Sequence, residues 1–144
     1  MTVSLRTASA KEIHLLYAQL PEFDTRHSLL EIEMRLQNQP HHLLMAEVAG
    51  RTAGFITGYA LDPLLFCGWL GGVLPEYRRR GVASALWTAQ EEWAAARGYS
   101  KITVKTRNRF QGMLLFLITN HYQLTRLDVR DKEEENLIWL TKSL

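Results

Sequence analysis

One short segment has the residue types and the spacing to bind a compact polyanion. It reads Arg78-Arg79-Arg80-Gly81-Val82-Ala83-Ser84 and stands directly before an amphipathic stretch of helical period. The first backbone N–H groups of a helix lack intrahelical partners, and the helix dipole favours an anion beside them. Gly81 and Ala83 are small enough for an anion to approach the backbone closely. The segment therefore predicts a turn that binds a pyrophosphate at the start of a helix.

Side chains of the same segment could strengthen this binding. Arg78 and Arg80 can form charge-assisted hydrogen bonds, and Ser84 can donate its hydroxyl. Three arginines alone are also typical of a solvated surface, but an apolar stretch and Pro75 before them and a long amphipathic stretch after them favour binding. Neither the Walker A pattern nor G-x-G-x-x-G occurs. Nucleic-acid binding is unlikely because no aromatic residues interleave with the arginines in a stacking pattern.

The strands and helices that must position this turn can be predicted from hydrophobic periodicity and from the capping, Gly and Pro residues at their ends. Strands are expected at residues 3–6, 42–49, 52–60, 65–73, 101–106, 122–130 and 136–141. Helices are expected from the capping box Ser9-x-x-Glu12 to Pro21, around residues 29–36, over residues 81–97 with Gly98 as the cap, and after Asn108. The helix over residues 81–97 joins two strands, which predicts that these are parallel neighbours. The sequence thus predicts an α/β sandwich with a mixed sheet.

The composition indicates a single domain over residues 1–144. Hydrophobic residues make up 47% and charged residues 22%, close to the globular average, and the formal net charge is +2. Cys67, the single cysteine, cannot form an internal disulfide, and no His/Cys spacing suits a metal. No apolar run approaches the roughly 20 residues that span a bilayer, and the N-terminus lacks the apolar core of a signal peptide. We therefore expect a cytoplasmic protein without a metal or a membrane partner.

Two segments resemble motifs of one enzyme superfamily. Residues 71–86 read GGVLPEYRRRGVASAL and resemble motif A of the GNAT acetyltransferases, which is [QR]-x-x-G-x-[GA] after a strand that ends in V-x-P. Residues 108–114, NRFQGML, resemble the start of the motif B helix, and Asn120-His121-Tyr122 stands where Gly-Phe usually closes it. The resemblance extends to the order of elements along the chain. It implies the GNAT three-layer sandwich, with a mostly antiparallel central sheet of about seven strands, a central β-α-β unit and four helices.

The resemblance implies that acetyl-coenzyme A is the co-substrate. The backbone of residues 79–84 would hold its pyrophosphate, the backbone around Val73 would pair with its pantetheine arm, and Asn108 would form a hydrogen bond with it. The expected cofactor-binding residues are thus Val73, Arg78, Arg79, Arg80, Gly81, Val82, Ala83, Ser84 and Asn108. The strands on either side of the turn would splay apart and admit an amine.

The resemblance implies transfer of an acetyl group to a primary amine of a small molecule or a peptide, by direct attack in a ternary complex. A non-catalytic acyl-coenzyme A binding module is the alternative. It stays open because Leu117, beside Phe116, occupies the position where many motif B helices carry a tyrosine, and because residues 66–72 contain no carboxylate. Family members often dimerise through C-terminal strands, and Ile138 and Trp139 are candidates for such a contact.

The chemistry requires groups that handle protons. An amine with a pKa of about 10.4 is almost wholly protonated at neutral pH, so a proton must leave before attack. Glu47 and Tyr59 are the candidate catalytic residues, although strand residues of these types more often lie at a surface or core edge. A backbone N–H of Val73 or Leu74 could stabilise the oxyanion. Catalysis would otherwise rest on positioning, with water as the proton relay.

Other polar residues have simpler interpretations. Three residues in the loop between the first two helices could hold a cationic acceptor or be solvated loop residues: Glu22, Asp24 and His27. Cys67 is an improbable nucleophile because the sequence places no histidine beside it. His41 and His42 face opposite sides of a strand and therefore do not form a metal pair.

Overall fold

The computed structural model describes residues 2–23 and 26–144 and consists of a sheet with helices on both faces. Along the chain the elements are β1 (Val3–Thr7), α1 (Ala10–Tyr17), α2 (Leu29–Leu36), β2 (His41–Val48), β3 (Arg51–Ala60), β4 (Leu65–Val73), η1 (Pro75–Tyr77), α3 (Val82–Ala96), β5 (Lys101–Arg107), α4 (Gln111–Thr119), β6 (Gln123–Asp128), η2 (Glu133–Glu135) and β7 (Leu137–Ser143). Both η elements are short 3-10 helices.

The seven strands form one sheet in the order β1-β2-β3-β4-β5-β7-β6. Every neighbouring pair is antiparallel except β4 and β5, which are parallel and joined by the crossover through α3. A parallel pair needs such a crossover because the chain must return to the end at which the first strand began. The predicted mixed, mostly antiparallel sheet with a central β-α-β unit is confirmed.

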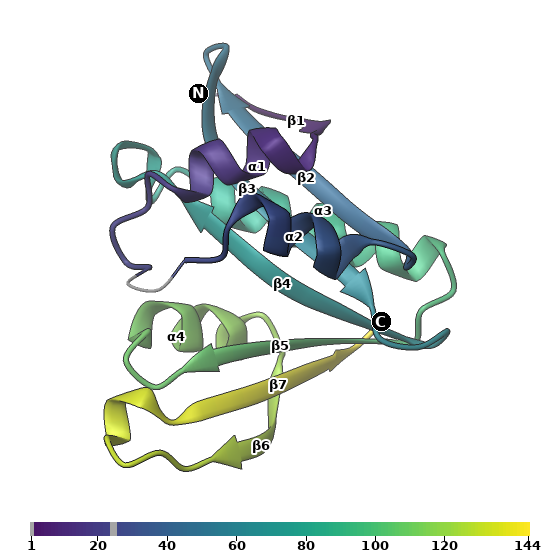
Figure 1. The fold of residues 1–144 in the computed structure, drawn as a ribbon, viewed down its shortest axis with the longest axis vertical. Helices are drawn as coiled ribbons and strands as arrows, with labels where there is room; N and C mark the ends of the chain where they lie inside the picture. The colour runs from purple at the N-terminus through teal and green to yellow at the C-terminus, as the bar shows by residue number, and fades with distance from the viewer. Residues whose placement is uncertain (1, 24–25) are drawn as a thin grey trace.

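Two hydrophobic cores lie on opposite faces of the sheet because successive strand side chains alternate between faces. The α3–α4 core contains Leu86 and Leu117 from the helices and Phe66 from β4. The α1–α2 core contains Ile13 and Ile32, with Cys67 from the same strand. Figure 1 shows α1 and α2 in front of the sheet and α3 behind it. This arrangement is the predicted three-layer sandwich.

Both N-terminal helices begin at a capping box. Ser9 and Glu12 form the predicted one, in which each side chain binds the other residue's backbone N–H. Ser28 and Glu31 form a second box of the same S-x-x-E spacing, which was not among the predicted features. Each box satisfies backbone donors that would otherwise have no partner at the helix start.

Several element boundaries differ from the prediction by a few residues. Helix α3 starts at Val82 because Gly81 adopts a left-handed conformation, with φ of 80°, and serves as the N-cap. Strand β6 is shorter at both ends than the expected residues 122–130. Tyr122 lies before it with a buried side chain in the α3–α4 core. Ile138 is likewise buried in this core, so it is not available for the dimer contact suggested above.

Candidate active site

Strands β4 and β5 separate part-way along their length. They pair from Leu65↔Lys101 to Gly68↔Val104 and no further, so residues 69–73 of β4 have no partner on that side. Figure 1 shows β5, β7 and β6 diverging from β4 beyond this point. We call the unpaired residues 69–73 and the facing residues 105–107 the fork. The splayed strands expected from the sequence are therefore present.

A β-bulge in β4 coincides with the base of the fork. Ile56↔Gly71 and Gly58↔Gly68 are partners across β3 and β4, so β4 has one more residue than β3 between these pairs. The fully buried Thr57 side chain fills the gap: its Oγ1 donates to Leu70 O and accepts from Leu70 N, both at 2.9 Å. Because a bulge bends its strand, this one turns β4 away from β5.

The backbone of Val73 faces the fork. Leu74 N–H donates to Ala53 O in the β3 direction at 2.8 Å, and alternate residues of an antiparallel strand point their backbone groups to opposite sides. The backbone groups of Val73 therefore point away from β3. Of the two oxyanion donors considered from the sequence, Leu74 N–H is already occupied, and Val73 N–H is the one that can reach a substrate.

The arginine-glycine turn leads from the end of β4 into α3. Arg79 and Gly81 both have positive φ angles, of 62° and 80°. The first hydrogen bond of the helix runs from Ala85 N–H to Gly81 O at 3.0 Å, so the N–H groups of residues 82–84 lie ahead of the helical hydrogen-bond ladder. A Cβ added at Gly81 would have no other protein atom within 4 Å. The outer side of the turn is thus open to an anion.

The side chains of the turn differ in burial: one is in the core and others are exposed. Val82 is buried in the α3–α4 core, so it contributes only its backbone to the surface of the turn. Arg79, Arg80 and Ser84 are exposed, and the Arg80 guanidinium lies 5.9 Å from the Tyr77 ring centroid. A diphosphate on the backbone N–H groups could therefore be reached by cationic and hydroxyl side chains.

Arg78 has a structural role that the sequence did not reveal. Its Nη2 donates to Glu22 Oε1 at 2.8 Å, and its Nε donates to Val73 O at 3.0 Å. It therefore ties the turn to the end of β4 and to the segment after α1. Glu22 Oε1 is engaged in this ion pair, whereas Glu22 Oε2 is buried and has no hydrogen-bond partner among the described residues, so a role of Glu22 in binding a cationic acceptor stays a prediction. Asp24, the second residue suggested for that role, lies outside the described residues.

The far side of the fork is formed by the end of β5 and the start of α4. Asn108 N–H donates to Asn136 O at 2.9 Å, and Asn108 Nδ2 donates to Glu133 O at 3.2 Å. These bonds fix Asn108 against the loop between β6 and β7. Phe110 lies 6.4 Å from Phe23, measured between ring centroids, so the segment after α1 contacts the residue that precedes α4.

Tyr59 and Cys67 are partners across β3 and β4 just below the fork. Tyr59 Oη accepts a hydrogen bond from Arg35 Nη1 at 3.1 Å. Burial, followed by the neighbouring Cys67, raises the pKa of Tyr59, so its phenol stays protonated at neutral pH and is a poor general base. Burial also raises the pKa of the Cys67 thiol, which argues against a thiolate nucleophile.

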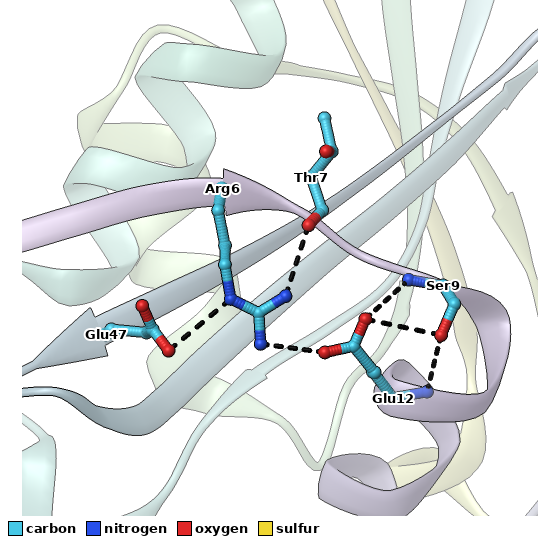
Figure 2. A network of polar contacts seen from close by, with 5 residues as sticks. All are labelled: Arg6, Thr7, Ser9, Glu12 and Glu47. Atoms are coloured by element: carbon cyan, nitrogen blue, oxygen red, sulfur yellow. Dashed lines mark hydrogen bonds and ion pairs between the residues drawn. The ribbon is translucent and has the colours of Figure 1, made fainter.

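Glu47 lies away from the fork. It is on β2, which β3 separates from β4. Figure 2 shows its carboxylate directed at Arg6, whose Nε lies 3.4 Å from Glu47 Oε2 and whose Nη2 lies 2.8 Å from Glu12 Oε2. The structure therefore joins Glu47 to the capping box of α1 and does not bring it together with the other predicted site residues.

The residues at the C-terminal end of the segment that resembles motif B belong to the hydrophobic core. Leu117 is fully buried, and Phe116 lies 6.1 Å from Trp87 between ring centroids. Tyr122 Oη donates to Glu91 Oε2 at 2.7 Å, and burial followed by this contact raises the pKa of the phenol. Because α4 contains no tyrosine, the proton donor common in similar enzymes has no counterpart on this helix.

Other candidate features are a surface hollow and a buried histidine. A surface hollow of about 510 Å³ lies where β4 and β5 begin, lined by Asp62, Ser100 and Lys101 among others, and contains no predicted site residue. His42 is buried and stacks on Trp93 at 4.5 Å between ring centroids, as expected for core packing. Within residues 2–23 and 26–144, no cluster of three or more His, Cys, Asp or Glu residues could hold a metal, and no helix is long and apolar enough to cross a membrane.

Comparison with protein families identifies the family of this chain. The model of the acetyltransferase (GNAT) family matches residues 9–116, which include α1, the fork and α3. The chain belongs to the GNAT family. Acetyl-coenzyme A is the acyl donor of this family, and a Cβ at Gly81 in the turn before α3 would have no other protein atom within 4 Å.

Bacterial relatives of this GNAT chain are also acetyltransferases. One from Sodalis glossinidius is 40% identical over 78 residues, which are 54% of each chain. One from Photorhabdus laumondii is 31% identical over 110 residues, which are 76% of this chain and 71% of the relative. The match thus spans about half the length of the Sodalis protein.

Solved structures share the GNAT fold at low identity. Ard1 from Thermoplasma volcanium superposes with a TM-score of 0.86 at 19% identity, covering 100% of this chain and 99% of that one. A GNAT family acetyltransferase from Elizabethkingia anophelis with acetyl-CoA bound has a TM-score of 0.76 at 16% identity, covering 99% and 98%. At these identities the likeness concerns the fold alone.

Proposed function

We propose that this protein is an N-acetyltransferase that transfers the acetyl group of acetyl-coenzyme A to a primary amine by direct attack in a ternary complex. The observation that carries the proposal is the open turn at Gly81 next to the fork in the sheet. Backbone N–H groups of residues 82–84, with Arg79 and Arg80, would bind the diphosphate. Val73 would bind the pantetheine arm through its backbone.

The fork supports attack without a covalent enzyme intermediate. The amine nitrogen forms the C–N bond with the thioester carbonyl carbon, the C–S bond breaks, and the thiolate leaves with the electron pair. Val73 N–H would stabilise the oxyanion, because the neighbouring Leu74 N–H is already bonded to Ala53 O. Cys67 takes no part, because its thiol is buried and its pKa is raised by that burial.

Proton transfer relies on water in this proposal. Residues 66–72 contain no carboxylate, α4 contains no tyrosine, and Tyr59 is a buried phenol held by Arg35. The amine therefore loses its proton to water, and the leaving thiolate gains one from water or from the amine through water. Positioning of the two substrates supplies most of the acceleration.

A non-catalytic acyl-coenzyme A binding module is the second candidate, favoured by the buried Leu117 at the position where similar enzymes carry a tyrosine. Thermal stabilisation by acetyl-coenzyme A tests binding, and release of free thiol with a panel of amines tests transfer. We expect both stabilisation and thiol release. Stabilisation without thiol release from any amine would support the module, and absence of stabilisation would contradict both functions.

A further inference from the structure

A surface of cations and aromatic rings lies beside the fork on the face covered by α1 and α2. We call it the rim, and its members are His27, Arg35, Trp69, Lys105 and Trp139. Trp69 packs against the α1–α2 core, which places it on that face. Lys105 follows Val104 in β5 and therefore lies on the opposite face of the sheet from it, since Val104 belongs to the α3–α4 core. Trp139, between the core residues Ile138 and Leu140, shares that face with Lys105.

Each side of the fork has its own cation–aromatic contacts. The Arg35 guanidinium lies 5.1 Å from the Trp69 ring centroid, and the His27 and Trp69 ring centroids are 5.3 Å apart. On the other side, Lys105 Nζ lies 5.1 Å from the Trp139 ring centroid. Trp69 thus presents a ring beside α2, and Trp139 presents one beside β5. The base of the fork lies between them.

Among the described residues, two of the rim's cations have no carboxylate at ion-pair distance. His27 is 3.5 Å from Glu31, which is its possible ion-pair partner. Within the part of the chain that the structure describes, no carboxylate lies within ion-pair distance of Arg35 or Lys105. Both side chains are exposed. Burial raises the pKa of the Cys67 thiol, and a hydrogen bond with Tyr59 opposes this rise. The positive charges of Lys105 and Arg35 also oppose it, so both charges act on the Cys67 thiol, which lies just below the fork.

We propose that the acceptor is a small amine that also carries a carboxylate, as free amino acids do, and that Arg35 and Lys105 bind this carboxylate. The inference rests on the proposed acetyl transfer. Two unneutralised cations attract a carboxylate and repel a polyamine. The same positive potential disfavours the ammonium form of the acceptor, so it helps to supply the neutral amine that attack requires. Trp69 and Trp139 offer apolar faces to the acceptor's side chain.

The direct test compares amino acids with analogues that lack the carboxylate, such as tryptophan with tryptamine and lysine with cadaverine. Thiol release gives kcat/KM, and calorimetry gives acetyl-coenzyme A binding separately. We expect at least one amino acid to exceed its decarboxylated analogue by about 10-fold or more, the effect of one charge-assisted hydrogen bond. Equal or higher activity with every analogue would overturn the inference. So would a preference for an acidic peptide over all free amino acids, or no transfer to any of them while the cofactor binds. Loss of cofactor binding itself would instead contradict the proposed function.

Substitutions of single rim residues test which side chains bind the carboxylate of the acceptor. Lys105→Gln and Arg35→Gln should each raise KM for the amino acid by about 10-fold and reduce its advantage over the analogue, with KM for acetyl-coenzyme A unchanged. Lys105→Arg should retain the advantage. Lys101→Gln is the matched control, because it removes the same charge from the opposite end of β5. If Lys105→Gln behaves like Lys101→Gln, the assignment of Lys105 is wrong.

Discussion

Gly81 combines a left-handed backbone conformation with open space beside its Cα. Its φ of 80° suits glycine, and the space where a Cβ would project is open. Gly98, after the other end of α3, has the same properties, with φ of 89° and no protein atom within 4 Å of an added Cβ. The two glycines differ in what we expect beside them, because only the first adjoins the N-terminus of the helix.

The variant Gly81→Val tests the cofactor site against Gly98→Val. Each change places a β-branched residue at a positive φ, so both should destabilise the fold to a similar degree. Only Gly81→Val should also weaken acetyl-coenzyme A binding, by at least about tenfold, since its Cβ would block the diphosphate. Calorimetric binding and urea unfolding of both variants provide the comparison. Equal affinity for the cofactor in the two variants would show that the turn is not the diphosphate site.

His42 is a second residue with a measurable consequence. Burial, followed by the charge of Arg97, lowers the pKa of His42 from 6.5 to about 4, so the folded protein binds this proton more weakly than the unfolded chain does. The lowered pKa of His42 therefore has no effect on the free energy of unfolding above pH 6.5. As the pH falls from 6.5 to 4, the free energy of unfolding decreases by at most about 3 kcal/mol. Urea unfolding at both ends of this range measures the loss. His42→Phe, which can still stack on Trp93, should show a smaller loss than the native protein.

At the scale of elements, the geometry of the site depends on where β4 leaves its neighbour. The bulge around Leu70 and the end of pairing at Gly68 occur within two residues of each other. Thr57 supports the bulge by making both a donor and an acceptor contact with the Leu70 backbone. The fork therefore depends on a side chain of β3, although β3 itself forms no part of it.

Thr57→Val removes the hydroxyl with little change of shape. The buried Leu70 N–H and C=O would lose their partner, and we expect the free energy of unfolding to fall by about 1–3 kcal/mol. The rate of acetyl transfer should also fall, because the direction of β4 into the fork is no longer fixed. Thr57→Ser keeps the hydroxyl and should stay near the native values. A Thr57→Val protein with native stability and rate would mean that the bulge is held by other contacts.

Across the described part of the molecule, three acid–base candidates are held by contacts with other residues. Glu47 is held by Arg6 at the β1 side of the sheet, Tyr122 is bonded to Glu91 beneath α3, and Tyr59 is held by Arg35. The protein consequently contributes orientation, backbone donors and electrostatic potential. Its dependence on pH should then reflect the acceptor amine more than the enzyme.

The pH profile of kcat/KM for the acceptor follows from this arrangement. We expect about a tenfold rise per pH unit up to the pKa of the amine, because only the neutral amine attacks. Tyr59 should not contribute in the neutral range, since its pKa is raised above its ordinary value of 10.0. Thiol release at constant ionic strength measures the profile. A plateau that begins near neutral pH would reveal a protein base at the site.

The amino-acid sequence by itself determined the local features of this protein. The capping box at Ser9, the glycine that precedes α3 and the order of strands and helices depend on residues close together in the chain, so spacing alone predicts them. Boundaries were less certain, because the burial of Tyr122 and the left-handed angle of Gly81 shift them by a residue or two. The GNAT resemblance rested on two such local segments.

Tertiary structure alone decided which side chains meet. Arg78 and Glu22 are 56 residues apart, and their ion pair ties the arginine-glycine turn to the segment after α1. The hydrogen bond of Leu74 leaves Val73 as the available backbone donor. Arg35 from α2 and Lys105 from β5 lie on the same face of the sheet at opposite sides of the fork, and no spacing in the sequence relates them. Such contacts depend on strand register and on the packing of helices across the sheet, which are properties of the whole fold.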